Sequence, residues 1–333
     1  MKNALTHASW KIVTVMGIPI KIHVSWLIVF GLITWSLSSY YFPGAAPDLP
    51  TSSYWIKGAI AAILLFGSVV FHELAHSYVA KKYKIPISSI TLFVFGGVAQ
   101  MDAEPPTPKA EFKMAIAGPI SNFILAAFLL ILYSQPFSPS LKALCLYLLK
   151  VNLILGIFNL IPGFPMDGGR ILRAIIWKSK NDYYFATRQA SMVGQKIGLA
   201  FLIFGVFFLF IGNFAGIWLM IIGWFLYSGA HGSYLHASIQ EKLSGIRVKD
   251  VMATEIVSLT PSMTIDEVVY KFFLKYAYSG FPVFDDGKFL GIITLKEIKH
   301  VHRQDWLDVK VSEILDTYKK SWNVSPDLDI TKA

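Results

Sequence analysis

The stretch GAIAAILLFGSVVFHELAHSYVA, residues 58–80, decides how this chain of 333 residues folds. It is apolar up to Phe71, and as a helix rising 1.5 Å per residue it is long enough to cross a bilayer core. It nevertheless contains His72, Glu73 and His76. Ionisable groups inside a membrane helix are costly and usually have a function. The stretch therefore predicts a membrane helix that takes part in chemistry.

The composition of the whole chain agrees with a membrane protein. Hydrophobic residues make up 54% of the sequence and charged residues only 15%, with a mean hydropathy of +0.53, whereas a soluble domain carries about 25% charge. This composition excludes a disordered protein. The net charge of +9 is interpreted as the basic excess of cytoplasmic loops, so we expect no nucleic-acid partner. The single cysteine, Cys145, excludes an internal disulfide.

Uncharged stretches recur often enough to predict six membrane spans. The stretch 197–240 has no Asp, Glu, Lys or Arg and is about twice the length needed to cross a bilayer core, so it should cross twice and turn near Gly212. The other four spans lie within residues 24–47, 58–80, 114–141 and 151–166.

Basic residues between the predicted spans indicate their orientation. The connections after the second and fourth spans contain Lys81, Lys82, Lys84, Lys109, Lys113, Arg170, Arg173, Lys178, Lys180, Arg188 and Lys196. Lys57, Lys142 and Lys150 fall near outer ends of spans and are expected to extend to the outer surface. Because Lys and Arg concentrate in cytoplasmic loops, we expect a multi-pass protein of the cell membrane with both termini in the cytoplasm.

Two further stretches favour extended backbone. Residues 13–24 are rich in β-branched side chains, and residues 87–101 are β-rich around Phe95, Gly96 and Gly97. The second stretch is too apolar for a free loop, and at membrane depth its backbone must be satisfied by protein. We therefore expect a small membrane-associated β segment.

The histidines of the second span have the spacing of metal ligands. Positions i and i+4 of a helix face the same way, so His72 and His76 converge. Two neutral imidazoles suit zinc, and this leaves Glu73 free to take a proton from an activated water. The pattern predicts a zinc site with a general base beside it.

A third ligand is expected from the end of the fourth span. Asp167 is the only acidic residue near it and lies at the cytoplasmic end, the same depth as His76. An acidic cap near Arg170 is the alternative role for Asp167. Asn159, about one turn before Pro162, is placed to offer its amide to a scissile carbonyl as an oxyanion donor. Its alternative role is a hydrogen bond between helices.

HELAH at 72–76 followed by NLIPGFPMDG at 159–168 resembles the motifs of the site-2 protease family, intramembrane zinc metalloproteases of the peptidase M50 type. Two further landmarks agree, namely Phe95-Gly96-Gly97 and Ala117-Gly118-Pro119 followed by Asn122. The resemblance covers roughly residues 10–235. It implies one zinc ion per chain held by His72, His76 and Asp167, Glu73 as general base, and cleavage of a substrate's transmembrane helix near the cytoplasmic face. The PDZ domain of many bacterial relatives does not fit between the two motifs here.

A substrate helix hides its amides in internal hydrogen bonds and must be unwound before attack. An exposed strand beside the site can hold the unwound segment by strand addition. We expect Phe95, Gly96 and Gly97 to form this substrate-binding segment, because glycine permits a close approach of two backbones.

The composition changes after His236, and the remainder is charged with α/β alternation. Residues 246–305 resemble a CBS domain, and residues 306–333 resemble the start of a second, incomplete copy. Paired CBS domains bind adenine nucleotides such as ATP or AMP. Thr294 matches a nucleotide contact, whereas Glu297 replaces the usual Asp, so a dimerisation module without a ligand is the alternative. An unpaired CBS domain exposes a hydrophobic face, and we therefore expect a homodimer.

The expected fold is a membrane α-helical protease core over residues 1–240, with six transmembrane helices and a small β segment, followed by a cytoplasmic α/β CBS domain. The predicted function is zinc-dependent cleavage of membrane-bound regulatory proteins within the bilayer, regulated by the CBS module. A CBS-gated transporter or channel is the alternative, but transporters tend to contain internal repeats and we find none in this sequence. The complete HELAH and Asp167 set argues against an inactive scaffold.

Overall fold

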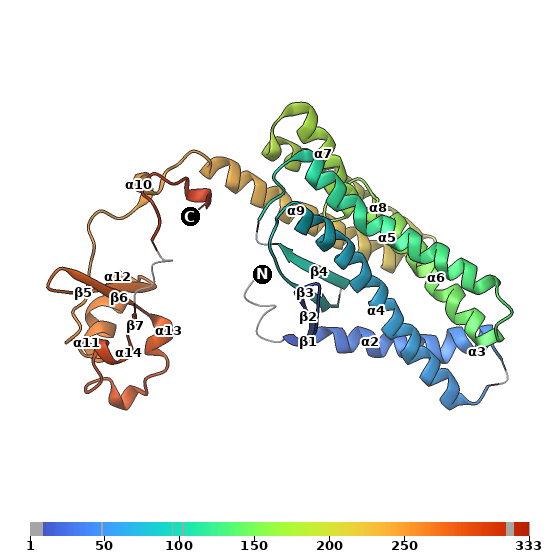
Figure 1. Cartoon of the computed structure of the whole chain (residues 1–333), viewed down its shortest axis with the longest axis horizontal. Helices are drawn as coiled ribbons and strands as arrows, with labels where there is room; N and C mark the ends of the chain where they lie inside the picture. Colours follow the sequence, from blue (N-terminus) through green and yellow to red (C-terminus); the bar gives the residue numbers. More distant parts are fainter. Residues whose placement is uncertain (1–8, 48, 95, 102, 318–322, 333) are drawn as a thin grey trace. The chain divides into compact units, whose positions relative to one another are not determined.

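The computed structural model describes residues 9–47, 49–94, 96–101, 103–317 and 323–332. The chain divides into two compact units, a larger one that ends at Glu241 and a smaller one that begins at Lys242 (Figure 1).

Long helices make up most of the larger unit. They are α2 (Ser25–Ser36), continued by a π-helical turn, η1 (Leu37–Tyr41), into α3 (Phe42–Ala45), then α4 (Thr51–Lys82), α5 (Pro108–Ser134), α6 (Pro139–Asn159), α7 (Asp167–Lys180), α8 (Tyr183–Phe210) and α9 (Ala215–Leu243). Among the described helices, α4, α5, α6 and α8 are long and apolar enough to cross a membrane. The larger unit is thus that of a helical membrane protein, while the count of six spans stays a prediction.

The third and fourth spans have other boundaries than hydropathy alone indicates. α5 ends at Ser134 and α6 begins at Pro139, so Lys142 and Lys150 lie on α6 and not in a connection between spans. Pro139 occupies the first turn of α6, where a missing N–H breaks no helical hydrogen bond. α6 ends at Asn159 because the following segment contains two prolines.

A four-stranded sheet contacts α4 in the larger unit. Its strands, in spatial order, are β1 (Ser9–Val15), β2 (Ile18–His23), β3 (Ile87–Phe93) and β4 (Gly96–Met101). Two antiparallel hairpins, β1–β2 and β3–β4, are joined by parallel pairing of β2 with β3, which places Ile20 opposite Ile90. β4 is therefore an edge strand of this sheet. Association of the sheet with a membrane stays a prediction.

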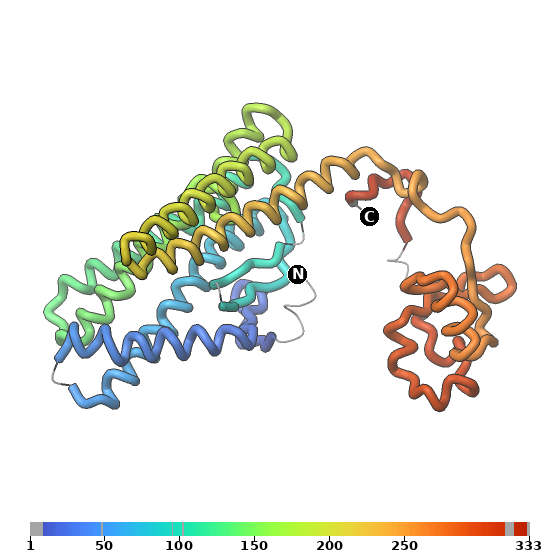
Figure 2. The backbone as a smooth tube through the Cα atoms, turned by 180° about the vertical axis from the view of Figure 1, so that it is seen from behind, coloured from blue at the N-terminus to red at the C-terminus, as the bar shows by residue number. Residues whose placement is uncertain are grey.

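Glycines allow α8 and α9 to run side by side (Figure 2). A Cβ atom on Gly198 would lie 2.6 Å from the backbone N of Tyr227, and one on Gly205 would lie 2.8 Å from the backbone O of Gly216. Small residues promote close packing of helices in membranes, where no hydrophobic force drives association.

The smaller unit combines a three-stranded sheet with short helices. Its elements are α10 (Val248–Val251), α11 (Ile265–Val268), η2 (Val269–Phe273), α12 (Leu274–Tyr276), β5 (Gly280–Asp285), β6 (Lys288–Thr294), α13 (Leu295–Ile298), η3 (Arg303–Asp305), α14 (Val311–Ile314), β7 (Asp316–Thr317) and η5 (Ile330–Lys332). The strands have the order β5-β6-β7. The core consists of the apolar side chains of Leu259, Ile265, Val268, Phe273, Phe281, Val283, Ile293, Ile298 and Val311.

Candidate metal and catalytic site

Three buried side chains from two helices converge in the larger unit. His72 and His76 lie one turn apart on α4, and Asp167 is the first residue of α7. The Nε2 atoms of the two histidines are 3.0 Å apart, and each lies 3.1 Å from Oδ2 of Asp167. Within the described part of the chain, these residues form a group that is able to hold a metal ion.

The geometry of this group fits zinc. Structural and catalytic zinc ions take imidazole nitrogen and carboxylate oxygen at about 2.0–2.2 Å. Ligand atoms at these distances around a tetrahedral ion are separated by about 3.3 Å, close to the 3.0 and 3.1 Å found here. Three protein ligands are the number found in catalytic zinc sites, which keep one position open.

The hydrogen bond at Nδ1 of each imidazole determines which ring nitrogen carries the proton. Nδ1 of His76 lies 2.7 Å from the backbone oxygen of Met114, which only accepts, so this Nδ1 carries a proton. Nδ1 of His72 donates to Oδ1 of Asn122 at 2.5 Å, because the amide nitrogen of Asn122 already donates to Asn152. Each Nε2 atom is left with a lone pair that points into the site, which is the tautomer a metal ligand needs.

Buried hydrogen bonds link Asn122, the acceptor for His72, to side chains on two other helices. Asn152 on α6 accepts from Asn122 on α5 at 3.0 Å and donates to Oγ of Ser68 on α4 at 3.1 Å. Gly118 on α5 lies against the imidazoles, since a Cβ atom there would be 2.3 Å from Nε2 of His76. Only glycine permits this approach. Gly118 and Asn122 belong to a landmark motif of the sequence, whereas no motif marks Asn152.

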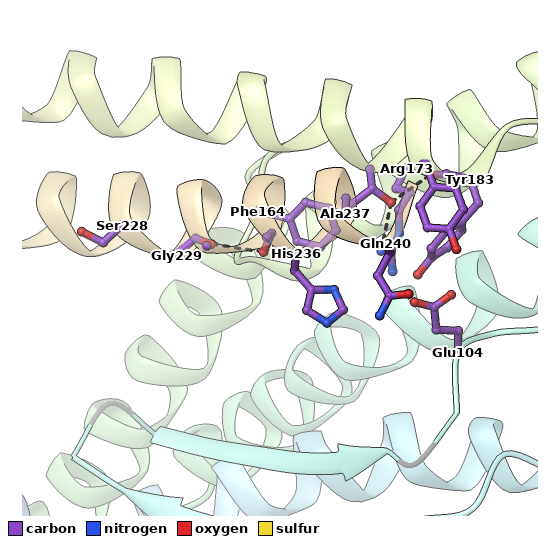
Figure 3. A pocket seen from close by; sticks show the side chains of 13 residues that line it. Glu104, Phe164, Arg173, Tyr183, Ser228, Gly229, His236, Ala237 and Gln240 are labelled. Carbon is purple, nitrogen blue, oxygen red and sulfur yellow. Dashed lines mark hydrogen bonds between the residues drawn. The ribbon is translucent and has the colours of Figure 1, made fainter. Parts of the chain in front are cut away.

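A buried ion pair anchors the helix that begins with Asp167. The carboxylate of Glu111 on α5 is fully buried, and it accepts hydrogen bonds from two guanidinium nitrogens of Arg173 on α7, one of them Nε at 2.8 Å. The guanidinium also lies over the rings of Phe164 and Tyr183. These three residues line a separate cavity of about 490 Å³ between α7, α8 and α9 (Figure 3). Arg170, the expected neighbour of an acidic cap at Asp167, lies 4.0 Å from the same Glu111 carboxylate, and no sequence motif marks this anchor.

A second cavity, of about 440 Å³, joins the three candidate ligands to Glu73 and Asn159. The carboxylate of Glu73 accepts the backbone N–H of Ala99 on β4 at 3.1 Å. The side chain of Asn159, at the end of α6, lines the cavity and makes no hydrogen bond with any described residue. The interhelical hydrogen bond considered as its alternative role is thus absent among those residues.

The free edge of β4 faces this cavity. The N–H of Ala99 points away from β3 toward Glu73, and because strand residues alternate, that of Gly97 points the same way. Gly97 lines the cavity, and a Cβ atom there would lie 3.0 Å from Cγ of Glu73. Gly96 has φ +121°, a conformation that favours glycine. Phe95, also predicted to bind substrate, lies outside the described residues.

The two candidate nucleotide contacts cap a short helix of the smaller unit. Thr294 is the N-cap of α13, and its N–H and hydroxyl both donate to the carboxylate of Glu297. Partial burial alone would raise the pKa of Glu297, but these hydrogen bonds outweigh it and hold the pKa below its ordinary value. The pair forms a capping box, which explains both residues without a ligand. Nucleotide binding stays a prediction.

Paired histidines on a membrane-length helix, a glutamate beside them and an aspartate from a second helix define a membrane metalloprotease. The family model described as peptidase family M50 matches residues 60–144 and 136–205, and the CBS domain model matches residues 248–303. The chain belongs to peptidase family M50, is a zinc metalloprotease of that family, and contains a CBS domain.

The similar proteins cover most of the chain. Zinc metalloprotease MJ0392 of Methanocaldococcus jannaschii is 39% identical over 324 residues, which are 97% of this chain and 86% of that protein. Rip3 of Mycobacterium tuberculosis is 34% identical over 293 residues, 86% of this chain and 74% of that protein. The solved structure of a site-2 protease from Methanocaldococcus jannaschii is 36% identical, covering 75% of this chain and 99% of that chain with a TM-score of 0.48.

Proposed function

We propose that this protein is a zinc-dependent intramembrane endopeptidase that cuts membrane-bound regulatory proteins in or near their transmembrane segments. The observation that carries the proposal is the convergence of His72, His76 and Asp167 beside Glu73. Two of these candidate ligands and Glu73 lie on α4, a helix long and apolar enough to cross a membrane. Ionisable groups at such a position are expected to serve a reaction inside the membrane.

The roles of the residues follow from their positions. His72, His76 and Asp167 would hold one zinc ion per chain, and zinc in such a site supplies Lewis-acid activation of water and of a peptide carbonyl. Glu73 is the general base, which takes a proton from the attacking water at a carboxylate oxygen and delivers it to the departing nitrogen. The free amide of Asn159 donates a hydrogen bond to the carbonyl oxygen as negative charge develops there.

The free edge of β4 is the proposed binding site for unwound substrate. A substrate strand added to this edge would displace the Glu73 carboxylate from the N–H of Ala99, and its carbonyls would accept the N–H groups that point into the cavity. Gly97 has no side chain that would block a second backbone from approaching this edge once Glu73 moves aside.

The proposal also includes the membrane topology of the chain and the role of its CBS domain. We infer six spans, the two further ones being residues 25–45 and α9, with both termini in the cytoplasm, in line with the distribution of basic residues. The CBS domain would then be cytoplasmic and form a homodimer, with residues 306–333 as the start of a second copy. Tyr270 and Leu274, 51% and 67% exposed and four positions apart, supply an apolar face for it.

Replacement of Glu73 by Gln tests the proposal. The Glu73→Gln protein should contain about one zinc ion per chain and lose cleavage of a transmembrane substrate, since the change removes a base and not a ligand. Glu255→Gln, an exposed position in the smaller unit, is the control and should retain both properties. Metal analysis and a cleavage assay measure the outcome. Cleavage by Glu73→Gln at the rate of the unchanged protein would refute the mechanism.

A further inference from the structure

A groove of about 970 Å³ follows the faces of α4 and α5 that do not carry the metal site. Its lining on α4 takes the positions i, i+3, i+4, i+7, i+8 and i+11 counted from Phe71, and its lining on α5 takes the same spacing counted from Lys113. Each set is one stripe along a helix. Two stripes of equal length therefore face one elongated groove, which is the shape of a site for a chain-like ligand.

Most of the groove is apolar and open. Phe71, Ile120 and Ile124 are 46%, 45% and 60% exposed, although they belong to helices long enough to cross a membrane. In a bilayer such a surface contacts hydrocarbon. Ser121 is the only serine or threonine in the lining. The middle of the groove thus fits an acyl chain.

One end of the groove is basic. Lys82 is the last residue of α4 and Lys113 lies near the start of α5, and both line the groove and are exposed. Neither ammonium group forms an ion pair with a described residue, and the groove lining contains no carboxylate. Nζ of Lys82 lies 4.3 Å from the ring centre of Tyr78. Two unpaired cations at the end of an apolar groove complement an anionic head group.

We propose that this groove binds one anionic phospholipid, with its acyl chains along the apolar stripes and its phosphate between Lys82 and Lys113. Basic pockets between membrane helices recognise anionic head groups, and each lysine near the membrane surface strengthens such binding several-fold. Tyr78 and Tyr83 line the same basic end, where tyrosine rings prefer the boundary of the bilayer.

A lipid in this position would also act on the metal site, an extension that rests on the proposed proteolytic function. The same two helices hold the hydrogen bonds from His72 to Asn122 and from His76 to Met114. An occupied groove would fix the separation of α4 and α5, and we expect turnover to rise when the lipid is bound. Lipid binding itself is independent of this extension.

Direct lipid binding to the purified full-length protein tests the proposal. Native mass spectrometry in detergent would compare phosphatidylglycerol with phosphatidylcholine of the same acyl chains. Phosphatidylglycerol should bind more tightly, and the double variant Lys82→Gln, Lys113→Gln should weaken its binding by about tenfold or more while phosphatidylcholine is little affected. The control, Lys84→Gln with Lys180→Gln, removes the same charge at exposed positions outside the groove and should leave binding unchanged.

Two further arms make the test decisive. Ile120→Trp fills the groove and should weaken binding of both lipids, whereas soluble glycerol phosphate should not compete with phosphatidylglycerol. Zinc content verifies that each variant is folded. Equal binding of the two lipids, equal loss in the control pair, competition by glycerol phosphate alone, or a protein cross-linked in the groove in place of lipid would each overturn the proposal.

Discussion

The two units of this protein bury different kinds of side chain. All buried polar side chains of the described residues belong to the larger unit, whereas the core of the smaller unit is entirely apolar. A buried polar group destabilises a protein unless its hydrogen bonds are made. In the larger unit these bonds run from Ser68 through Asn152 and Asn122 to His72. The larger unit is therefore organised around its candidate site, and the smaller one around its apolar packing.

Removal of a candidate metal ligand from the larger unit should have the largest effect on zinc content and cleavage. Asp167→Ala removes the carboxylate that lies 3.1 Å from both imidazoles, so zinc should fall from about one per chain to near zero and cleavage should be abolished. Asp308→Ala, an exposed position of the smaller unit, is the control and should change neither. Metal analysis of both proteins checks this. Full zinc content in Asp167→Ala would remove Asp167 from the proposed ligand set.

The hydrogen-bond network around the ligands should produce the next effect. Asn122→Leu leaves Nδ1 of His72 without its acceptor, and the loss of such a partner lowers metal affinity or activity by about 10–100-fold. Competition with a chelator measures the zinc affinity. Ser134→Ala alters the far end of α5, where the hydroxyl donates to the backbone of Ile131, and serves as the control. Equal affinities in both variants would mean that Asn122 merely packs.

The parts of the candidate site that have a side-chain signature could be predicted from the sequence. His72, Glu73 and His76 follow from helical spacing, and Asp167 follows from its isolation among apolar residues. The acceptor for His76 is the backbone oxygen of Met114, which leaves no trace in residue type.

Other features depend on contacts between distant segments or on turns that hydropathy does not resolve. The pairing of Glu111 with Arg173 joins residues far apart in the sequence. The charged connection after the fourth span contains the helix α7, whose basic residues lower its mean hydropathy and hide its apolar face. The capping box of Thr294 and Glu297 has the sequence pattern T-x-x-E, which a resemblance to nucleotide-binding CBS domains does not distinguish from a nucleotide contact.

A bulky residue at Gly97 should separate substrate handling from metal binding. In Gly97→Val, the new side chain would collide with Glu73 and narrow the space beside β4, so turnover should fall by about tenfold or more while zinc content changes little. Ile12→Ala, a 59% exposed position on β1 at the opposite edge of the sheet, is the control. Cleavage rates and metal content, measured on the same preparations, decide the result. Equal loss of both in Gly97→Val would make the segment purely structural.

The smallest effects on cleavage are expected from changes in the smaller unit, because such changes would act only through dimerisation. Deletion of residues 246–333 should leave zinc content unchanged, abolish dimerisation and change cleavage or its response to ATP by a few-fold. A nucleotide can act only by binding one arrangement of the two modules better than another.

A milder variant, Leu274→Glu, places a charge on the exposed apolar face and should also give monomers, whereas Leu307→Glu, at an equally exposed position elsewhere in the unit, should not. Light scattering on the detergent-solubilised protein measures the assembly, and cleavage with and without ATP measures the coupling. If the deletion protein remained dimeric and cleaved substrate at an unchanged rate, the smaller unit would have no part in the reaction. The larger unit would then assemble on its own.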